Sequence, residues 1–326
     1  MVTLKMNILI TGATGFIGRH LAAALSKTYS VRCLVRKSSD ITPLKHLNVD
    51  ITNGDLLVKH SLGPALDGID LVYHLAGEVY SRKKSDYYKG NVLATHNLLE
   101  ACKEKGTKRI IFLSSIGVYK PATKETLLTE ESECRPLTIY GKTKLDAERL
   151  IKEYNIPWVI VRAPIIYGPY QPPVLNRFFL DAFKKRKVYI VGKGDNPRSL
   201  CFIDNLVDGL MLLANRQDKN RKTYILSDNA PYTSDEIITT ISEVIGHKIE
   251  VVHLPNILGN ISWQIYKLMG KLFSLYFIEL YAIRTMQLHW ECDITKAKKE
   301  IGYTPNLTLE MGIKCAMNWI RDSHTR

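Results

Sequence analysis

The sequence lacks several features that define simpler classes of protein. Its six cysteines lie far apart and form no Cys-x-x-Cys pair, so neither a disulfide framework nor a zinc or other metal site is expected. The apolar region 260–290 is interrupted by Lys267, Lys271, Glu279 and Arg284, so no uncharged run approaches the roughly 20 residues that span a bilayer. The first strand begins almost at once, which predicts no cleavable signal peptide and, with the scattered cysteines, a cytoplasmic protein.

Acidic residues are also fewer than basic residues. The chain of 326 residues holds 32 Asp and Glu against 45 Lys and Arg, which gives a net charge of +13. No nucleic-acid recognition motif accompanies this charge, so nucleic acid is not expected as a partner. Solvated lysine-rich faces are the leading interpretation, and attraction of an anionic substrate or of acidic lipid are the alternatives. Region 260–290 predicts two amphipathic helices over the substrate site, and a membrane contact there is the less favoured interpretation.

What is present is an alternation of short apolar strands with helices. Helices are predicted at Phe16–Ser26, at Ser85–Lys105 and from Tyr140 to about Tyr154. The strands are predicted at Met6–Thr11, Ser30–Val35, Val49–Thr52, Asp70–Ala76, Arg109–Ser114 and Trp158–Arg162. Such alternation predicts an α/β fold with a doubly wound parallel sheet of the Rossmann type.

The pattern changes after Gly168-Pro169. Phe202–Ala214 predicts a return to the nucleotide domain, and Tyr224–Ser227 a late strand. We therefore expect residues 1–168 and 198–228 to form an NAD(P)-binding domain. Residues 169–197 and 229–326 would form a smaller, mainly helical substrate lobe that is interleaved with it in sequence.

A glycine-rich turn, residues 11–18, joins the first strand to the first helix. Gly12 permits a tight turn, Gly15 lets the backbone approach a pyrophosphate, and Gly18 allows the helix to pack closely on the strand. The helix N-terminus then offers N–H groups to phosphates. The predicted cofactor contacts of this turn are Gly12, Thr14, Gly15, Phe16, Ile17 and Gly18.

Two further residues bear on the adenosine half of the cofactor. Arg36 ends the second strand, where NAD-binding folds often carry an acidic residue, and with Lys37 and Ser38 it could receive a 2′-phosphate. This favours NADP slightly over NAD, although an arginine stacked on adenine would suit either. Asp55, after the third strand, would accept a hydrogen bond from the adenine amino group or would cap a loop.

The candidate catalytic residues follow the fifth strand. Ser114 and Ser115 end that strand, where ligands gather in open α/β sheets. Tyr140 and Lys144 lie four residues apart, on one face of a helix. A serine can hold a substrate oxygen while the tyrosine exchanges its proton, and Lys144 would favour the phenolate.

These residues together resemble the extended short-chain dehydrogenase/reductase family, of the NAD-dependent epimerase/dehydratase type. The resemblance spans nearly the whole chain in family order. It is carried by residues 11–18, Asp55-Leu56, residues 74–77, Gly90-Asn91-Val92, residues 114–119, 140–144, 162–169, 198–205 and 293–297, and Leu309-Glu310.

The resemblance implies a role for each matching position. Tyr140 would be the acid/base, Lys144 its helper and Ser115 the substrate anchor, with Asn91 supporting the active-site region. Arg198 would contact the diphosphate of a nucleotide-sugar, or would be a surface arginine near the lobe junction. Further cofactor contacts would come from Leu56, Leu75, Ala76, Gly77, Ser114, Pro164 and Ile165. Family members commonly dimerise through two helices, here those containing Ser85 and Tyr140.

The leading hypothesis is an NAD(P)-dependent epimerase or oxidoreductase of a nucleotide-sugar. Ile116-Gly117 stands where dehydratases usually carry an Asp-Glu pair, which argues against dehydration. The 254–290 region is similar to hydroxysteroid dehydrogenase and dihydroflavonol reductase branches, so a reductase or dehydrogenase of an apolar alcohol or ketone is the alternative. A non-catalytic nucleotide sensor is a third hypothesis, disfavoured by the Ser/Tyr/Lys set.

Overall fold

The computed structural model describes residues 6–216 and 218–324. Its centre is a seven-stranded parallel sheet with the order β10-β6-β5-β4-β1-β2-β3. The strands are β1 Asn7–Thr11, β2 Ser30–Val35, β3 Asp50–Asn53, β4 Leu71–His74, β5 Arg109–Ser115, β6 Trp158–Ala163 and β10 Lys222–Ile225. The predicted Rossmann sheet is confirmed.

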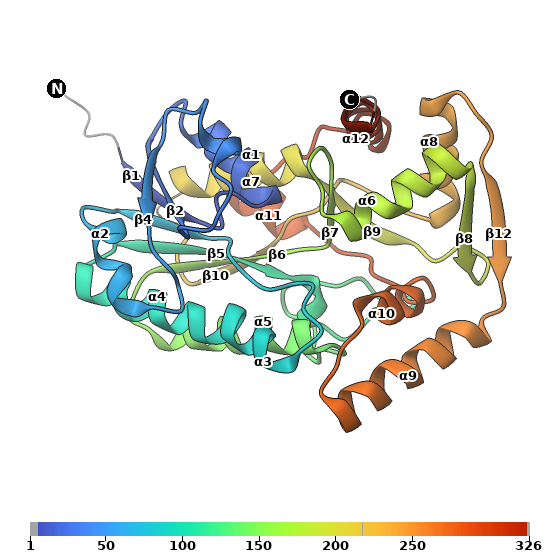
Figure 1. The fold of residues 1–326 in the computed structure, drawn as a ribbon, viewed down its shortest axis with the longest axis horizontal. Helices are drawn as coiled ribbons and strands as arrows, with labels where there is room; N and C mark the ends of the chain where they lie inside the picture. Colours follow the sequence, from blue (N-terminus) through green and yellow to red (C-terminus); the bar gives the residue numbers. More distant parts are fainter. Residues whose placement is uncertain (1–5, 217, 325–326) are drawn as a thin grey trace.

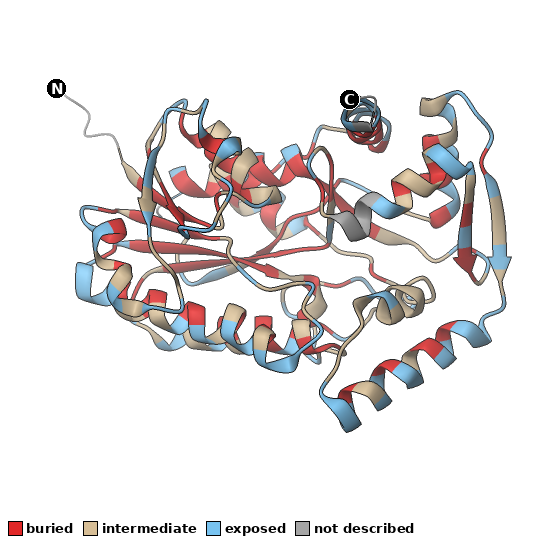
Figure 2. Ribbon diagram, in the orientation of Figure 1, coloured by how far each residue is buried: buried red, intermediate tan, exposed pale blue. Residues whose placement is uncertain are grey.

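Helices cover both faces of this sheet (Figure 1). One face carries α2 Gly63–Leu66, α3 Lys84–Tyr87, α4 Ala94–Lys105 and α5 Ile139–Glu153, and the other carries α1 Phe16–Leu25, α7 Ile203–Asn215 and α11 Thr295–Ile301. Ile8 and Ile10 enter the core on one side, whereas Leu9 enters the core on the other. Both faces of these strands are therefore buried (Figure 2). This burial explains why each strand is a continuous apolar run in the sequence.

The remaining elements form two small sheets and their helices. A three-stranded sheet has the order β11-β9-β7, and β8 pairs in parallel with β12. The strands are β7 Ile165–Tyr167, β8 Lys187–Val191, β9 Arg198–Phe202, β11 Pro231–Tyr232 and β12 Glu250–Leu254. The helices are α6 Pro173–Leu180, α8 Ser234–Ile245, α9 Ile257–Phe273, α10 Ile278–Thr285 and α12 Leu309–His324.

The strands β8, β11 and β12 fall within the segments that the sequence predicts to form a mainly helical lobe. β8 and β12 come from the two separate segments assigned to the substrate lobe, and they pair with each other. The exact division into two lobes stays a prediction. Within the described ranges, no helix is long and apolar enough to cross a membrane.

One helix departs from the predicted continuous helix at Ser85–Lys105. A π-helical segment, Tyr88–Leu93, lies between α3 and α4, and Asn91 is its buried centre. Such wider turns often occur at functional sites, because they re-aim a side chain without breaking the helix.

Candidate active site

The predicted site residues meet along the carboxyl edge of the central sheet. Strand order changes direction between β1 and β4, and ligands bind at such a switch point in open α/β sheets. Six strands end there and bring the predicted residues to one edge. Those positions are Gly12 after β1, Arg36 after β2, Asp55 and Leu56 after β3, Leu75, Ala76 and Gly77 after β4, Ser114 and Ser115 in β5, and Pro164 and Ile165 after β6.

The glycine turn lies at the switch point itself. Gly12 has a φ of +73°, and a Cβ on it would come within 2.8 Å of the Ala76 nitrogen, so the turns after β1 and β4 touch. Gly15 is exposed and precedes α1 as its N-cap, without a capping side chain. The first N–H groups of α1 are therefore available to an anion such as a diphosphate.

The far end of the edge holds the two adenosine candidates. Arg36 is exposed directly after β2, with Lys37 and Ser38 beside it in sequence. Asp55 accepts a hydrogen bond from the Leu57 nitrogen at 2.9 Å. The structure thus shows the loop-capping role for Asp55, and its contact with adenine stays a prediction.

The start of α5 sets the position of Tyr140. Thr138 caps the helix, since its hydroxyl accepts a hydrogen bond from the Gly141 nitrogen at 3.0 Å. A Cβ on Gly141 would overlap the Gly117 carbonyl oxygen, so this glycine lets α5 approach the turn after β5. Ser115 lies close enough to Tyr140 to lower the pKa of the phenol, and Ser115 Oγ accepts a hydrogen bond from the Gly117 nitrogen at 3.0 Å. The structure therefore brings Ser115 and Tyr140 together, as predicted.

Burial shifts the pKa values of the tyrosine and the lysine in opposite directions. Desolvation raises the pKa of Tyr140 to about 12, against the effect of Ser115, which lowers it. Desolvation lowers the pKa of Lys144 to about 7, against the charge of Glu148, which raises it. Lys144 Nζ lies 4.0 Å from the centre of the Phe112 ring. Near neutral pH the cofactor-free site thus holds a protonated phenol beside an amine that readily loses its proton.

Asn91 ties the site to the loop after β4. Its side chain accepts a hydrogen bond from the Glu78 nitrogen at 2.8 Å and donates to the Glu78 oxygen and to Thr143 Oγ1, each at 3.0 Å. A Cβ on Gly77 would lie 2.8 Å from Asn91 Oδ1 and 3.7 Å from Lys144 Nζ. Asn91 is therefore a positioning residue, which fixes the loop against α5.

His74, which has no role predicted from the sequence, extends this network. His74 Nδ1 lies 2.8 Å from Thr11 Oγ1, and its Nε2 lies 2.9 Å from Thr95 Oγ1. Thr95 donates to the Asn91 carbonyl oxygen at 2.6 Å. Burial lowers the pKa of His74 to about 3, so the ring is neutral and serves as a donor–acceptor link.

A buried ion pair joins α5 to β6 and was also missed. Arg162 contacts both carboxylate oxygens of Glu148, at 3.0 and 2.6 Å, and donates to the Tyr119 hydroxyl at 2.6 Å. Ser114 donates to the same carboxylate. Burial lowers the pKa of Arg162, but the bonds and charge of Glu148 outweigh it and raise the net value. One feature of the sequence could have indicated Glu148 as a site residue. It follows Lys144 by four residues and therefore shares its helix face.

Arg198 lies at the start of β9. One guanidinium nitrogen donates to the Met286 carbonyl oxygen at 3.4 Å, and its buried Nε has no partner among the described residues. Burial lowers the pKa of this arginine. An unpaired donor on a desolvated cation suits an anionic ligand group.

The family assignment follows from a comparison with known proteins. A model described as the NAD dependent epimerase/dehydratase family matches residues 8–226. The chain belongs to this family. The protein is therefore an NAD(P)-dependent enzyme of the epimerase or oxidoreductase kind.

Three similar proteins illustrate the range of the family. The N-acetyl-alpha-D-glucosaminyl-diphospho-ditrans,octacis-undecaprenol 4-epimerase of Escherichia coli O157:H7 is 27% identical over 94% of this chain and 95% of that protein. A 4-hydroxy-2-methyl-3-oxo-4-farnesyl-3,4-dihydroquinoline-1-oxide ketoreductase of Stigmatella aurantiaca is 27% identical over 94% and 93%. The structure of UDP-glucuronic acid 4-epimerase from Bacillus cereus in complex with NAD aligns with a TM-score of 0.80 at 25% identity, covering 98% and 100%.

Proposed function

We propose that the protein is an NAD(P)-dependent epimerase or oxidoreductase acting on a hydroxyl or keto carbon of a nucleotide-sugar. The observation that carries the proposal is the proximity of Ser115 and Tyr140, with Lys144 one helical turn away, at the carboxyl edge of β5. The similar Escherichia coli and Bacillus cereus proteins are both named as epimerases of sugars carried on a diphosphate.

Each catalytic side chain has a separate task in this reaction. When bound, the nicotinamide ring accepts the hydride from the sugar carbon. Ser115 Oγ holds the oxygen on that carbon, and Tyr140 Oη takes its proton as the carbonyl forms. In its protonated form, Lys144 would stabilise the phenolate by its positive charge. In an epimerase Tyr140 returns the proton after the hydride has returned to the opposite face of the carbon.

Arg198 is the candidate contact for the substrate diphosphate. Its unpaired Nε and its buried cationic group support this role. We expect Arg198→Ala to weaken binding of a nucleotide-sugar by about 1.5–3 kcal/mol, the range for a hydrogen bond to a charged group. Isothermal titration with UDP-sugars measures this, and an unchanged affinity would remove the diphosphate assignment.

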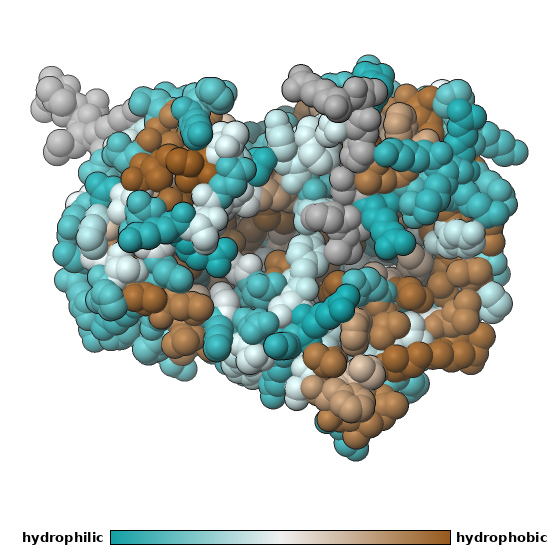
Figure 3. Space-filling view, viewed as in Figure 1, coloured by the Kyte–Doolittle hydropathy of each residue, from teal (hydrophilic) through white to brown (hydrophobic). Residues whose placement is uncertain are grey.

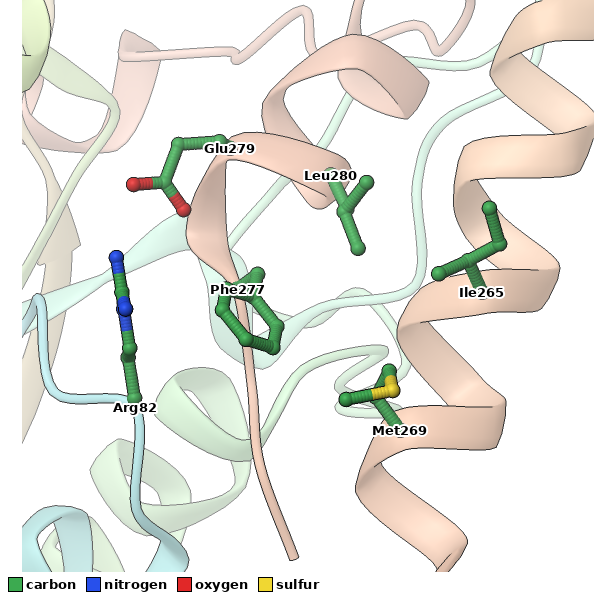
Figure 4. A pocket seen from close by; sticks show the side chains of 6 residues that line it. All are labelled: Arg82, Ile265, Met269, Phe277, Glu279 and Leu280. Carbon is green, nitrogen blue, oxygen red and sulfur yellow. The ribbon is translucent and has the colours of Figure 1, made fainter. Parts of the chain in front are cut away.

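A reductase or dehydrogenase of an apolar alcohol or ketone is the second candidate. It is supported by an apolar hollow of about 370 Å³ between α9 and α10 (Figure 4). Ile265, Met269, Phe277 and Leu280 line it, and Arg82 and Glu279 stand at its margin. Turnover of prenylated or sterol-like ketones, without binding of UDP-sugars, would favour this candidate.

We propose that the protein slightly prefers NADP to NAD. Arg36 supports this, since it is exposed where a 2′-phosphate would meet the end of β2 and no acidic residue occurs at positions 36–39. Mass spectrometry of the denatured protein, followed by titration with NADH and NADPH, distinguishes the outcomes. Tightly retained NAD(H) indicates an epimerase that recycles its cofactor and contradicts the NADP preference, whereas an empty protein that selects NADPH indicates a reductase.

A cytoplasmic homodimer completes the proposal. The helices beginning near Ser85 and at Ile139 pack side by side on one face of the sheet, where the family's dimer contact is expected, and Tyr88 and Leu93 expose apolar surface there. Light scattering of the purified protein measures the assembly. A monomer at micromolar concentration would contradict this part of the proposal.

A further inference from the structure

The outer face of α9 is an exposed apolar stripe. Its side chains have exposed fractions of 39 to 61%, and they recur at helical spacing along the full length of the helix. They are Ile257, Leu258, Ile261, Ile265, Leu268, Leu272 and Phe273. At 100° per residue the first six occupy roughly a third of the helix circumference, whereas Phe273 lies outside that arc and is exposed at the end of the helix. The space-filling view shows this apolar patch along α9 (Figure 3).

The opposite face of α9 explains why this stripe points outward. The buried residues of the helix are Gly259, Ser262, Tyr266 and Gly270, which are mostly small. A Cβ on Gly259 would overlap the Gln287 side chain, and one on Gly270 would come within 2.6 Å of the Tyr276 ring. The helix therefore packs through its glycines, and rotating it to bury the isoleucines would force large side chains into these close contacts. Its polarity is the reverse of that of an ordinary surface helix.

Basic side chains border the stripe, and acidic ones are absent from it. Residues 251–278 contain no Asp or Glu, while Lys267 and Lys271 are exposed on α9. The exposed segment Arg82-Lys83-Lys84 lies beside the C-terminal end of the helix. Lys83 forms an isolated antiparallel β-bridge with Leu275, and the backbone nitrogen of Lys84 donates to the backbone oxygen of Ser274 at 3.3 Å. Lys83, Lys84, Tyr88 and Phe273 line a shared hollow of about 510 Å³.

We propose that the α9 stripe docks on an anionic phospholipid bilayer, with Lys267, Lys271 and residues 82–84 meeting the lipid headgroups. An in-plane helix with an apolar face and a lysine-bearing flank is the physical requirement for such interfacial binding. Each basic side chain near an anionic surface adds electrostatic attraction.

Charge selects the bilayer over a second copy of the chain. A two-fold interface places the same patch against itself, so the lysines that border the stripe of one copy would face those of the other. The net charge of +13 opposes that pairing and favours an acidic surface.

Docking would bring the catalytic residues close to the membrane. Tyr266, on the inner face of α9, accepts a hydrogen bond at 3.4 Å from the nitrogen of Ile139, the residue before Tyr140. One helix diameter, roughly 10–12 Å, thus separates the stripe from the start of α5. Ile265 and Met269 of α9 also line the apolar hollow between α9 and α10.

Vesicle co-sedimentation of the full chain tests the proposal. We expect the protein to pellet with equimolar phosphatidylcholine/phosphatidylglycerol vesicles, and to be released by high salt. The triple variant Ile261→Glu, Leu268→Glu, Leu272→Glu should bind at least about tenfold more weakly. Met311→Glu is the matched control, because Met311 is 48% exposed on α12, and it should bind as the wild type does. Unchanged NADPH and NADH binding shows that each variant is folded.

A second pair of variants keeps the test decisive if the triple variant fails to fold. Lys83→Ser with Lys84→Ser should weaken binding to the anionic vesicles by roughly tenfold, whereas Lys314→Ser on α12 should not. The proposal is overturned if the wild type ignores anionic vesicles, if it binds neutral vesicles equally well, or if the control variants lose as much binding. A dimer that the α9 variant splits, with no vesicle binding, would assign the stripe to a second copy instead.

Discussion

Replacing Glu148 with glutamine tests how the buried ion pair supports α5. Glu148 and Arg162 have side-chain exposures of 0 and 3%, and their shortest contact is 2.6 Å. Glutamine keeps the size of the side chain but leaves the Arg162 guanidinium buried without a counter-charge. Removing one partner of a buried pair costs about 3–5 kcal/mol, a large part of the roughly 5–15 kcal/mol that stabilises a typical protein.

The substitution also changes the charge near Lys144. The negative charge of Glu148 raises the pKa of Lys144 against the larger effect of burial, so its removal should bring that pKa below about 7. Between the folded and unfolded pKa values of Lys144 the unfolded chain binds more protons, and stability therefore rises with pH from about 7 toward 10.5. In Glu148→Gln this rise should begin at a lower pH.

Urea unfolding of the cofactor-free protein across this pH range measures both effects. The double variant Glu148→Gln, Arg162→Met removes both charges, and it should recover most of the stability because a buried pair replaced by neutral groups is often nearly neutral in cost. It should keep the shifted pH dependence, since Lys144 still lacks its neighbouring charge. A single variant that loses less than about 1 kcal/mol, or a double variant no more stable than the single one, would refute this account of the pair.

Four smaller predictions concern the same site. Tyr140→Phe should lower turnover by about 10²–10⁴ with unchanged NAD(P) affinity, measured by steady-state kinetics and titration; retained turnover would exclude Tyr140 as the acid/base. Lys144→Met should flatten the rise of stability with pH between about 7 and 10.5, seen in urea unfolding, and an unaltered slope would show that another group titrates there. Thr138→Ala should destabilise the protein by about 1 kcal/mol through loss of the α5 cap, measured in the same way against exposed Lys142→Ala. Gly77→Ala should displace the Asn91 side chain, which lies 2.8 Å from the added Cβ, and lower both turnover and thermal stability; unchanged turnover would show that Asn91 does not position the site.

The central sheet could be predicted because its signals are local. Ile8, Leu9 and Ile10 form an uninterrupted apolar run before a glycine turn, and such a run identifies a strand buried on both faces. β8 and β12 carry no such signal, since they are partly exposed and pair across more than 60 residues of sequence. The pairing of distant, half-buried segments depends on tertiary packing rather than on local pattern.

The site was predicted in part for the same reason. Ser115, Tyr140 and Lys144 can be recognised in the sequence by their residue types, their spacing and their order along the chain. Glu148 and Arg162 do not, because charged residues are usually exposed and only the packing of α5 on β6 shows them to be buried. For α9 the sequence predicted an amphipathic helix but not which side faces outward, since the outcome depends on how closely its glycines approach their neighbours.

The order of the strands has a consequence for redesign of the enzyme. Arg36 follows β2 and Ser115 ends β5, and two other strands, β1 and β4, lie between them. Three strand spacings amount to roughly 14 Å, which exceeds the Debye length of about 8 Å at physiological salt. A charge exchanged at position 36 is therefore felt only weakly at the reacting carbon. The residue proposed to select the cofactor and the residues proposed to carry the reaction lie at separate places along one edge of the sheet. Each can therefore be altered while the other is held constant.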